Sequence, residues 1–312
     1  MYKVLITGAA GFIGSHLCRK FIDEGFEVYG LDNLITGCIG NITGFDPSYF
    51  KFIEGDVTKN LDIDIDFDFI LHFACPASPK YFLKYPIETL KVNSLGTFNT
   101  LELAERCNAR YVFASTSEIY GDPLVHPQNE NYWGNVNPTG IRSVYNEAKR
   151  FSESLIMAYA RKDLDVRIAR IFNTYGPKMK HDDGRVIPTF IWLALQSKPL
   201  TVYGDGSQTR SFCYIDDLVD GVFKLSFTEG LNGKILNLGN PEEYTILDLA
   251  SIIIEKTVST SKIVFKPLPE DDPKRRQPDI TEAENNLKWR PLTPLDSGLD
   301  ETIKFFMSKL LR

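Results

Sequence analysis

A glycine-rich turn close to the start of the chain restricts the fold more than any other feature. The residues Gly8-Ala9-Ala10-Gly11-Phe12-Ile13-Gly14 follow the apolar run Lys3–Thr7 directly and open a predicted helix, with the spacing G-x-x-G-x-x-G. Glycines between a strand and a helix let the backbone approach a pyrophosphate that lies on the helix N-terminus. The turn therefore predicts a dinucleotide-binding fold, although a tight strand-to-helix turn also occurs without a ligand.

An acidic residue follows at a distance that suits such a site. Asp32 ends the second predicted strand, eighteen residues after Gly14. A carboxylate there accepts hydrogen bonds from the adenine-ribose hydroxyls and repels a 2′-phosphate, so we expect NAD rather than NADP. The predicted cofactor site consists of Gly8, Gly11, Phe12, Ile13, Gly14, Asp32, Asn33, Asp56, Val57, Ala74, Tyr145 and Lys149.

Short β-branched runs alternate with longer amphipathic segments. Strands are predicted over 3–7, 27–31, 52–55, 69–73, 111–115, 165–171 and 234–238, and helices after Gly11 and over 87–107, 143–162 and 212–227. This order indicates an α/β fold with a doubly wound parallel (Rossmann) sheet. We expect an NAD-binding Rossmann domain over 1–172 and 211–240, and a smaller discontinuous C-terminal substrate-binding lobe over 173–210 and 241–312.

A tyrosine and a lysine stand four residues apart on one predicted helix. Tyr145 and Lys149 therefore lie on the same helical face. A Tyr is a poor base near neutral pH, but an adjacent Lys and a positively charged nicotinamide favour its phenolate. Thr116, at the end of a strand, is placed to hydrogen-bond the same substrate hydroxyl. An ordinary surface pair has the same spacing, so the pair gains its meaning from the glycine turn.

Together, these features resemble the extended short-chain dehydrogenase/reductase family, in which such a Tyr and Lys carry acid–base chemistry beside a bound nicotinamide. The likeness extends over nearly the whole chain through HFACPASP (72–79), TSEIYGDP (116–123), YWGNVNP (132–138), RIARIFNTYGP (167–177), DGRV (183–186) and GSQTR (206–210). As a set, these segments are similar to the branch of the family that decarboxylates UDP-glucuronate to UDP-xylose.

The resemblance implies a reaction without net redox change. NAD⁺ takes hydride from C4 of the sugar while Tyr145 takes the hydroxyl proton, the resulting β-keto acid loses CO₂, and the retained NADH reduces C4 again. At the position of Ser117, related 4,6-dehydratases carry an Asp, which would oppose the substrate carboxylate. Glu118 is expected to act at C5. The predicted catalytic residues are Thr116, Ser117, Glu118, Tyr145 and Lys149.

The same resemblance assigns a substrate pocket to the second half of the chain. Arg276 is expected to contact the sugar carboxylate, because a guanidinium fork suits a carboxylate bidentately. The remaining predicted contacts are Asn173 and Arg185 for the UDP portion, Tyr203 and Gln208 for the uridine side, and Arg210 within the pocket.

Composition excludes several other classes of function. The 312 residues carry 35 basic and 41 acidic side chains, a net charge of -6, so we expect neither nucleic acid nor a membrane as partner. Five scattered cysteines without a C-x-x-C pair indicate a reducing, cytoplasmic setting. The four histidines share no metal-ligand spacing, so no metal is expected. A UDP-sugar is the expected partner.

The helices predicted over 87–107 and 143–162 carry more apolar residues than one sheet face needs, and related proteins pair these helices into a four-helix bundle. We therefore expect a homodimer.

Two alternatives of different kinds stay open. Within the enzyme class they are a nucleotide-sugar 4,6-dehydratase, against which Ser117 speaks, and a 4-epimerase. The other class is a catalytically silent NAD-binding regulatory module. The presence of Thr116, Glu118, Tyr145 and Lys149 argues against it.

Overall fold

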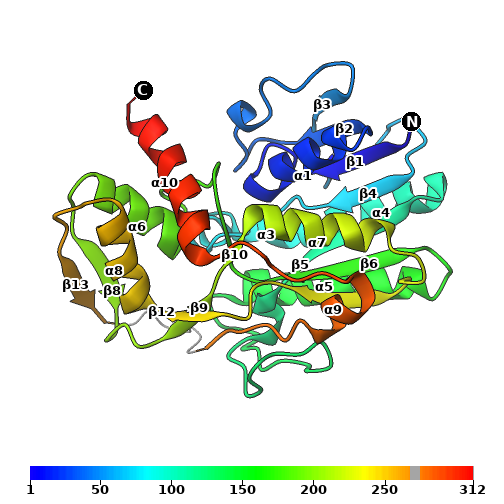
Figure 1. Cartoon of the computed structure of the whole chain (residues 1–312). Helices are drawn as coiled ribbons and strands as arrows, with labels where there is room; N and C mark the ends of the chain where they lie inside the picture. The colour runs from blue at the N-terminus through cyan, green and yellow to red at the C-terminus, as the bar shows by residue number, and fades with distance from the viewer. Residues whose placement is uncertain (268–274, 312) are drawn as a thin grey trace.

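The computed structural model describes residues 1–267 and 275–311, with a large sheet and a smaller lobe beside it (Figure 1). Residues 268–274 and 312, which belong to the range expected for the lobe, lie outside the described residues.

Seven parallel strands form the large sheet, in the order β11-β6-β5-β4-β1-β2-β3. Their bounds are β1 (Lys3–Thr7), β2 (Glu27–Asp32), β3 (Phe50–Glu54), β4 (Phe69–His72), β5 (Arg110–Thr116), β6 (Val166–Ile171) and β11 (Lys234–Leu238). The strand order reverses between β1 and β4, where sheets of this kind bind ligands at the carboxyl ends of their strands. The predicted doubly wound parallel sheet is confirmed.

Helices cover both faces of this sheet, because consecutive strand side chains point to opposite sides. Val4 and Ile6 belong to one apolar cluster, and Leu5 between them belongs to another. The first cluster lies under α1 (Phe12–Asp23) and α7 (Ile215–Phe227). The second lies under α4 (Thr97–Cys107) and α5 (Ser143–Ala160). The short helices nearby are η1 (Ile39–Asn41), α2 (Pro79–Lys84) and η3 (Ser117–Tyr120).

Two predicted helices differ in detail from the structure. The segment 87–107 is α3 (Pro86–Lys91), the π-helical turn η2 (Val92–Gly96) and α4 in succession, so one extra residue enters the helix. The helix expected from residue 212 begins at Ile215, because β10 (Cys213–Tyr214) first pairs in parallel with β7 (Thr174–Tyr175). That pairing joins segments far apart in the sequence, which local periodicity does not reveal.

The lobe is built from helices and small two-stranded sheets, at the left of Figure 1. Its elements are α6 (Val186–Leu195), β8 (Leu200–Tyr203), β9 (Thr209–Ser211), β12 (Glu243–Thr245), α8 (Ile246–Lys256), β13 (Ile263–Lys266) and α10 (Leu295–Leu310). Its buried residues continue the apolar cluster of α1 and α7. The helix α9 (Thr281–Leu287) packs against α7 and β11, beside the large sheet.

Within the part of the chain that the structure describes, no helix is both long and apolar enough to cross a membrane.

Candidate active site

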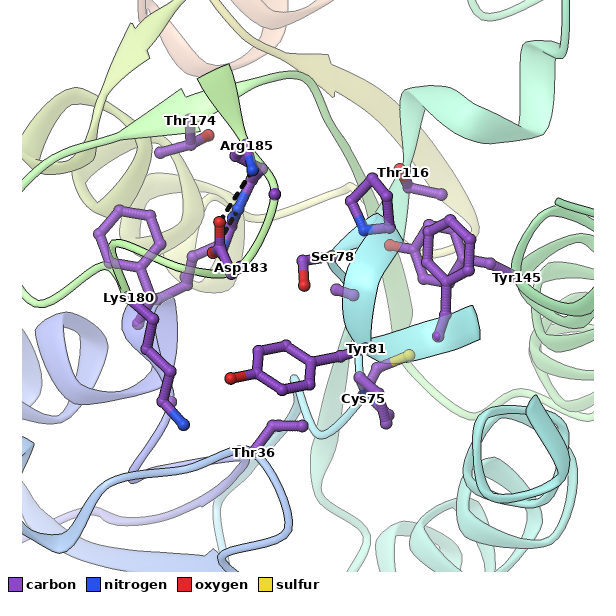
Figure 2. A pocket seen from close by; sticks show the side chains of 18 of the residues that line it. Thr36, Cys75, Ser78, Tyr81, Thr116, Tyr145, Thr174, Lys180, Asp183 and Arg185 are labelled. Carbon is purple, nitrogen blue, oxygen red and sulfur yellow. Dashed lines mark hydrogen bonds and ion pairs between the residues drawn. The ribbon is translucent and has the colours of Figure 1, made fainter. Parts of the chain in front are cut away.

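One cavity of about 1050 Å³ extends from the carboxyl edge of the sheet into the lobe. All the predicted catalytic, cofactor-binding and substrate-binding residues line it, from Gly8 and Asp32 at one end to Tyr203 and Arg210 at the other. Figure 2 shows part of its lining, with Tyr145 and Thr116 on one side and Asp183 and Arg185 on the other. The structure therefore brings the predicted residues together, while their individual roles stay predictions.

The cofactor end is shaped by glycines that no other residue could replace. Gly8 has a φ of +72°, and a Cβ there would lie 2.8 Å from the backbone nitrogen of Ala74. A Cβ on Gly14 would lie 2.1 Å from the carbonyl oxygen of Gly8. The turn consequently brings the start of α1 against the ends of the strands, which leaves the backbone exposed to the cavity and fits a dinucleotide.

Asp32 is held rigidly at the end of β2. Its carboxylate accepts hydrogen bonds from the backbone N–H groups of Ala10, at 2.9 Å, and Leu34, at 2.8 Å. Burial raises the pKa of this carboxyl, while the two backbone hydrogen bonds oppose that effect. The link to Ala10 also ties the acid to the glycine turn, so both parts of the predicted cofactor site are fixed relative to each other.

Tyr145 and Lys149 project from α5 and are both buried. Lys149 Nζ donates to the carbonyl oxygen of Ala114 at 2.7 Å, and burial lowers the pKa of its ammonium group. Burial raises the pKa of the Tyr145 phenol, whereas its hydrogen bond with Thr116 lowers it. The ring of Phe82 stacks on that of Tyr145, with centroids 5.1 Å apart. The phenol is therefore oriented, and ionising it requires additional positive charge in the cavity.

Glu118 lies between two arginines. Its Oε1 accepts hydrogen bonds from Arg142 Nη2, at 2.8 Å, and from Arg276 Nη1, at 2.5 Å. Burial alone would raise the pKa of Glu118, but the charges and hydrogen bonds of Arg276 and Arg142 lower it to about 2. In this arrangement Glu118 is a carboxylate at neutral pH. A proton-donating role at C5 then requires that its surroundings change when substrate binds.

The lobe side of the cavity carries further polar groups. Arg185 is neutralised by the buried Asp183, to whose Oδ2 it donates from Nε at 2.8 Å and from Nη2 at 2.5 Å (Figure 2). Gln208 donates to the carbonyl oxygen of Tyr203 at 2.8 Å. Among the residues described here, no group of three or more His, Cys, Asp or Glu side chains is placed to hold a metal ion.

Sequence reasoning assigned no role to three residues that shape this site. Arg142 precedes α5 and pairs with Glu118, Phe82 supports Tyr145, and Asp183 pairs with Arg185. The D-G-R spacing contained the signal for Asp183, because an acid and a base two residues apart can pair across a turn. Arg142 gave no such signal, since its partner is 24 residues away.

A Rossmann sheet with a glycine turn, an acid after β2 and a buried Tyr–Lys pair is the arrangement typical of proteins that bind a nicotinamide dinucleotide. The model of the NAD dependent epimerase/dehydratase family matches residues 4–239, and the chain belongs to that family.

Two curated relatives are UDP-glucuronic acid decarboxylases. Decarboxylase 1 of Danio rerio is 49% identical over 313 residues, which cover 99% of this chain and 73% of the relative. Decarboxylase 4 of Arabidopsis thaliana is 48% identical over 310 residues, covering 99% and 69%. Among solved structures, the UDP-glucuronic acid 4-epimerase of Bacillus cereus in complex with UDP-glucuronic acid and NAD has a TM-score of 0.89 at 30% identity, covering 98% of this chain and 99% of that one.

Proposed function

We propose that this chain converts UDP-glucuronate into UDP-xylose and CO₂. One observation carries the proposal beyond the similarity to decarboxylases. Arg276 is buried in the cavity and uses Nη1 to hold Glu118, but its Nε and Nη2 atoms have no hydrogen-bond partner in the described part of the chain. These two atoms form the side edge of the guanidinium, whose parallel N–H groups match the two oxygens of a carboxylate. A uronic acid supplies such a carboxylate.

NAD would be held by the glycine turn and Asp32, together with Phe12, Ile13, Asn33, Asp56, Val57 and Ala74 at the cavity wall. When bound, it supplies a hydride acceptor and donor for C4 of the sugar. The fit is supported by the close approach of backbone at Gly8 and Gly14 and by the fixed carboxylate of Asp32.

The protein's own groups then handle the protons. Tyr145 takes the proton of the C4 hydroxyl, and Thr116 holds that hydroxyl. The Lys149 ammonium lies 6.0 Å from the centroid of the Tyr145 ring, where its positive charge favours the phenolate. A ketone at C4 makes the acid a β-keto acid, which loses CO₂ as its C5–C6 electron pair moves into an enolate. C5 must then gain a proton from solvent, and we assign the relay of that proton to the Glu118 carboxylate together with Ser117, both of which line the cavity.

The nucleotide would lie toward the lobe. Asn173 and Arg185 are assigned to the UDP portion, Tyr203 and Gln208 to its uridine side, and Arg210 to the substrate pocket, and all five residues line the cavity. The expected division into domains has the same order. The Rossmann domain, over 1–172 and 211–240, would hold the cofactor, and the lobe, over 173–210 and 241–312, would hold the nucleotide of the substrate. The segment that holds α9 is an exception inside the second unit, because it packs on α7 and β11.

We also propose a homodimer through α3, α4 and α5. Exposed apolar residues lie on each of these elements: Ile87 and Leu90 on α3, Leu95 on η2, Phe98 on α4 and Phe151 on α5. The π turn inserts one residue, so Leu90 and Leu95 stay on one helical face although they are five residues apart. A continuous apolar stripe of this kind favours association. A cytoplasmic location is inferred from the five unpaired cysteines.

Incubation of the purified protein with UDP-glucuronate, with and without added NAD⁺, tests the proposed function. Mass spectrometry and proton NMR should show loss of CO₂ and a UDP-pentose. An unchanged mass with inverted C4 would instead establish a 4-epimerase, and loss of water would establish a dehydratase. If no sugar nucleotide turns over while NAD binds, the silent-module alternative stands.

A further inference from the structure

Two arginine side chains share one oxygen of Glu118. The proposed function gives one of them, Arg276, a role in binding the substrate carboxylate and gives the other no role. Arg142 and Arg276 both donate to Oε1. Glu118 Oε2 is buried and has no hydrogen-bond partner within the described residues. All three side chains line the cavity. The two arginines come from different places, since Arg142 precedes α5 and Arg276 lies after β13 in the C-terminal segment.

Arg142 is anchored to the helix that carries Tyr145. Its carbonyl oxygen accepts hydrogen bonds from the backbone N–H groups of Tyr145 and Asn146, both at 3.1 Å. Its guanidinium lies 5.8 Å from the centroid of the Phe82 ring, which in turn stacks on Tyr145. Arg142 therefore has a fixed place relative to the phenol. Arg276 also lines the cavity but differs from Arg142, because its buried Nε and Nη2 atoms have no hydrogen-bond partner within the described residues.

We propose that Arg142 is a positioning residue, which holds Glu118 in place and in its charged form while Arg276 also binds the carboxylate of the bound sugar. This inference rests on the proposed function. A substrate carboxylate at the Nε–Nη2 edge shares the charge of Arg276 with Glu118, and that sharing ends when the carboxylate leaves as CO₂. Arg142 is the cation whose contact with Glu118 lasts through both stages.

The charged and titratable groups that face Glu118, within the described residues, are Arg142 and Arg276 at its Oε1 and Tyr145, whose pKa Glu118 raises. Loss of Arg142 leaves Arg276 as the cation that both carboxylates require. The pKa of Glu118 then rises, because burial is opposed by less positive charge. Activity that needs the Glu118 carboxylate consequently fails at a higher pH than in the unmodified protein.

The test measures kcat and KM for UDP-glucuronate from pH 5 to 9 in Arg142→Gln and Arg142→Lys, each alone and combined with Glu118→Gln. We expect Arg142→Gln to lower kcat about 10- to 100-fold and to bring an acid limb of kcat into the measured range, because burial raises the pKa of Glu118 once Arg142 no longer opposes it. Arg142→Lys keeps a positive charge and one hydrogen-bond donor. Its kcat should therefore fall less, and the acid limb of its pH profile should not move. In the Glu118→Gln background, either Arg142 substitution should lower kcat further by less than about twofold, because Arg142 and Glu118 act through one interaction.

Arg150→Gln is the matched structural control. Arg150 also lies on α5 and donates to the carbonyl oxygens of Ile119 and Trp133, but it does not line the cavity. Its loss should lower Tm without moving the acid limb. The inference is overturned if Arg142→Gln lowers kcat equally at every pH, or if its loss in the Glu118→Gln background is as large as alone.

If Arg142→Gln does not fold, the comparison of Arg142→Lys alone and in the Glu118→Gln background decides the same question. The smaller loss of kcat in Arg142→Lys must also vanish in that background. Failure of the unmodified chain to release CO₂ from UDP-glucuronate overturns the proposed function and this inference with it. If the unmodified chain decarboxylates UDP-glucuronate but the effects of the Arg142 and Glu118 substitutions on kcat are additive, only this inference is overturned.

Discussion

The two ends of the cavity are built in different ways. The cofactor end consists mainly of backbone from one short segment, Gly8 to Gly14, which is held to Asp32 through the Ala10 N–H group. The substrate end consists of polar and charged side chains from several separate segments, and its Glu118–Arg276 contact joins residues 158 positions apart. A site made of local backbone leaves a pattern in the sequence, whereas a site made of distant side chains depends on the completed fold.

The two ends should also respond differently to substitution. At the cofactor end, a changed side chain disturbs a backbone arrangement, so NAD affinity should fall. At the substrate end, a changed side chain disturbs the division of charge between two arginines and two carboxylates, so selectivity for an acidic sugar should fall.

The largest effect is expected where the two ends meet. Tyr145→Phe should lower kcat about 10³-fold, because the general base is lost. Its NAD content and its affinity for UDP-glucuronate should change little, since the Phe82 ring still supports the aromatic ring. Steady-state kinetics, the absorbance of bound nucleotide and calorimetry measure the three quantities. A variant that retained more than about a tenth of the activity would show that another group takes the proton.

Arg276→Gln tests the substrate end alone. Affinity for UDP-glucuronate should fall about 10- to 100-fold, because a charged bidentate contact is lost. UDP-xylose, which has no carboxylate, should bind as it does to the unmodified protein. Calorimetric titration with both nucleotides gives the comparison. Equal weakening of the two would mean that Arg276 contacts the nucleotide and not the carboxylate.

Asp32→Asn tests the cofactor end alone. The change keeps the shape of the side chain but removes its charge, so NAD affinity should fall about tenfold. Binding of UDP-glucuronate to the NAD-loaded variant should stay unchanged. Fluorescence titration of NADH measures the first quantity and calorimetry the second. An unchanged NAD affinity would contradict the role given to this acid.

The smallest effect concerns the free energy of unfolding and comes from a residue on α1, next to the cofactor end. His16 on α1 is held neutral because burial lowers its pKa to about 4, while its hydrogen bond to the Pro177 carbonyl oxygen partly opposes this. The unfolded chain, with a pKa near 6.5, binds more protons below that pH, so stability is full above about pH 6.5 and declines toward pH 4.

Between pH 7.5 and 5.5 this group should cost about 1 kcal/mol of unfolding free energy. Chemical denaturation at both pH values should show a smaller decline in His16→Gln, whose side chain does not titrate. The same decline in both proteins would rule out His16 as a contributor.

The part of the molecule that was predictable follows this division. The seven strands of the large sheet and the glycine turn depend on local apolar runs and on backbone demands, and the structure contains them near the predicted bounds. The start of α7 at Ile215 was missed, because Cys213 and Tyr214 pair with β7 through the tertiary fold. Arg142 was missed for a related reason. An arginine just before a helix resembles any exposed arginine until Glu118 is placed beside it.

The most direct measurement uses UDP-glucuronate labelled with ¹³C at the carboxyl carbon, incubated with the purified protein in D₂O. We predict that the label is released as CO₂ and bicarbonate, and that the UDP-xylose formed carries one deuterium at C5, where the solvent-derived proton enters. Retention of the label in a sugar nucleotide with inverted C4 would contradict decarboxylation at this site and would assign its carboxylate-binding edge to an epimerase.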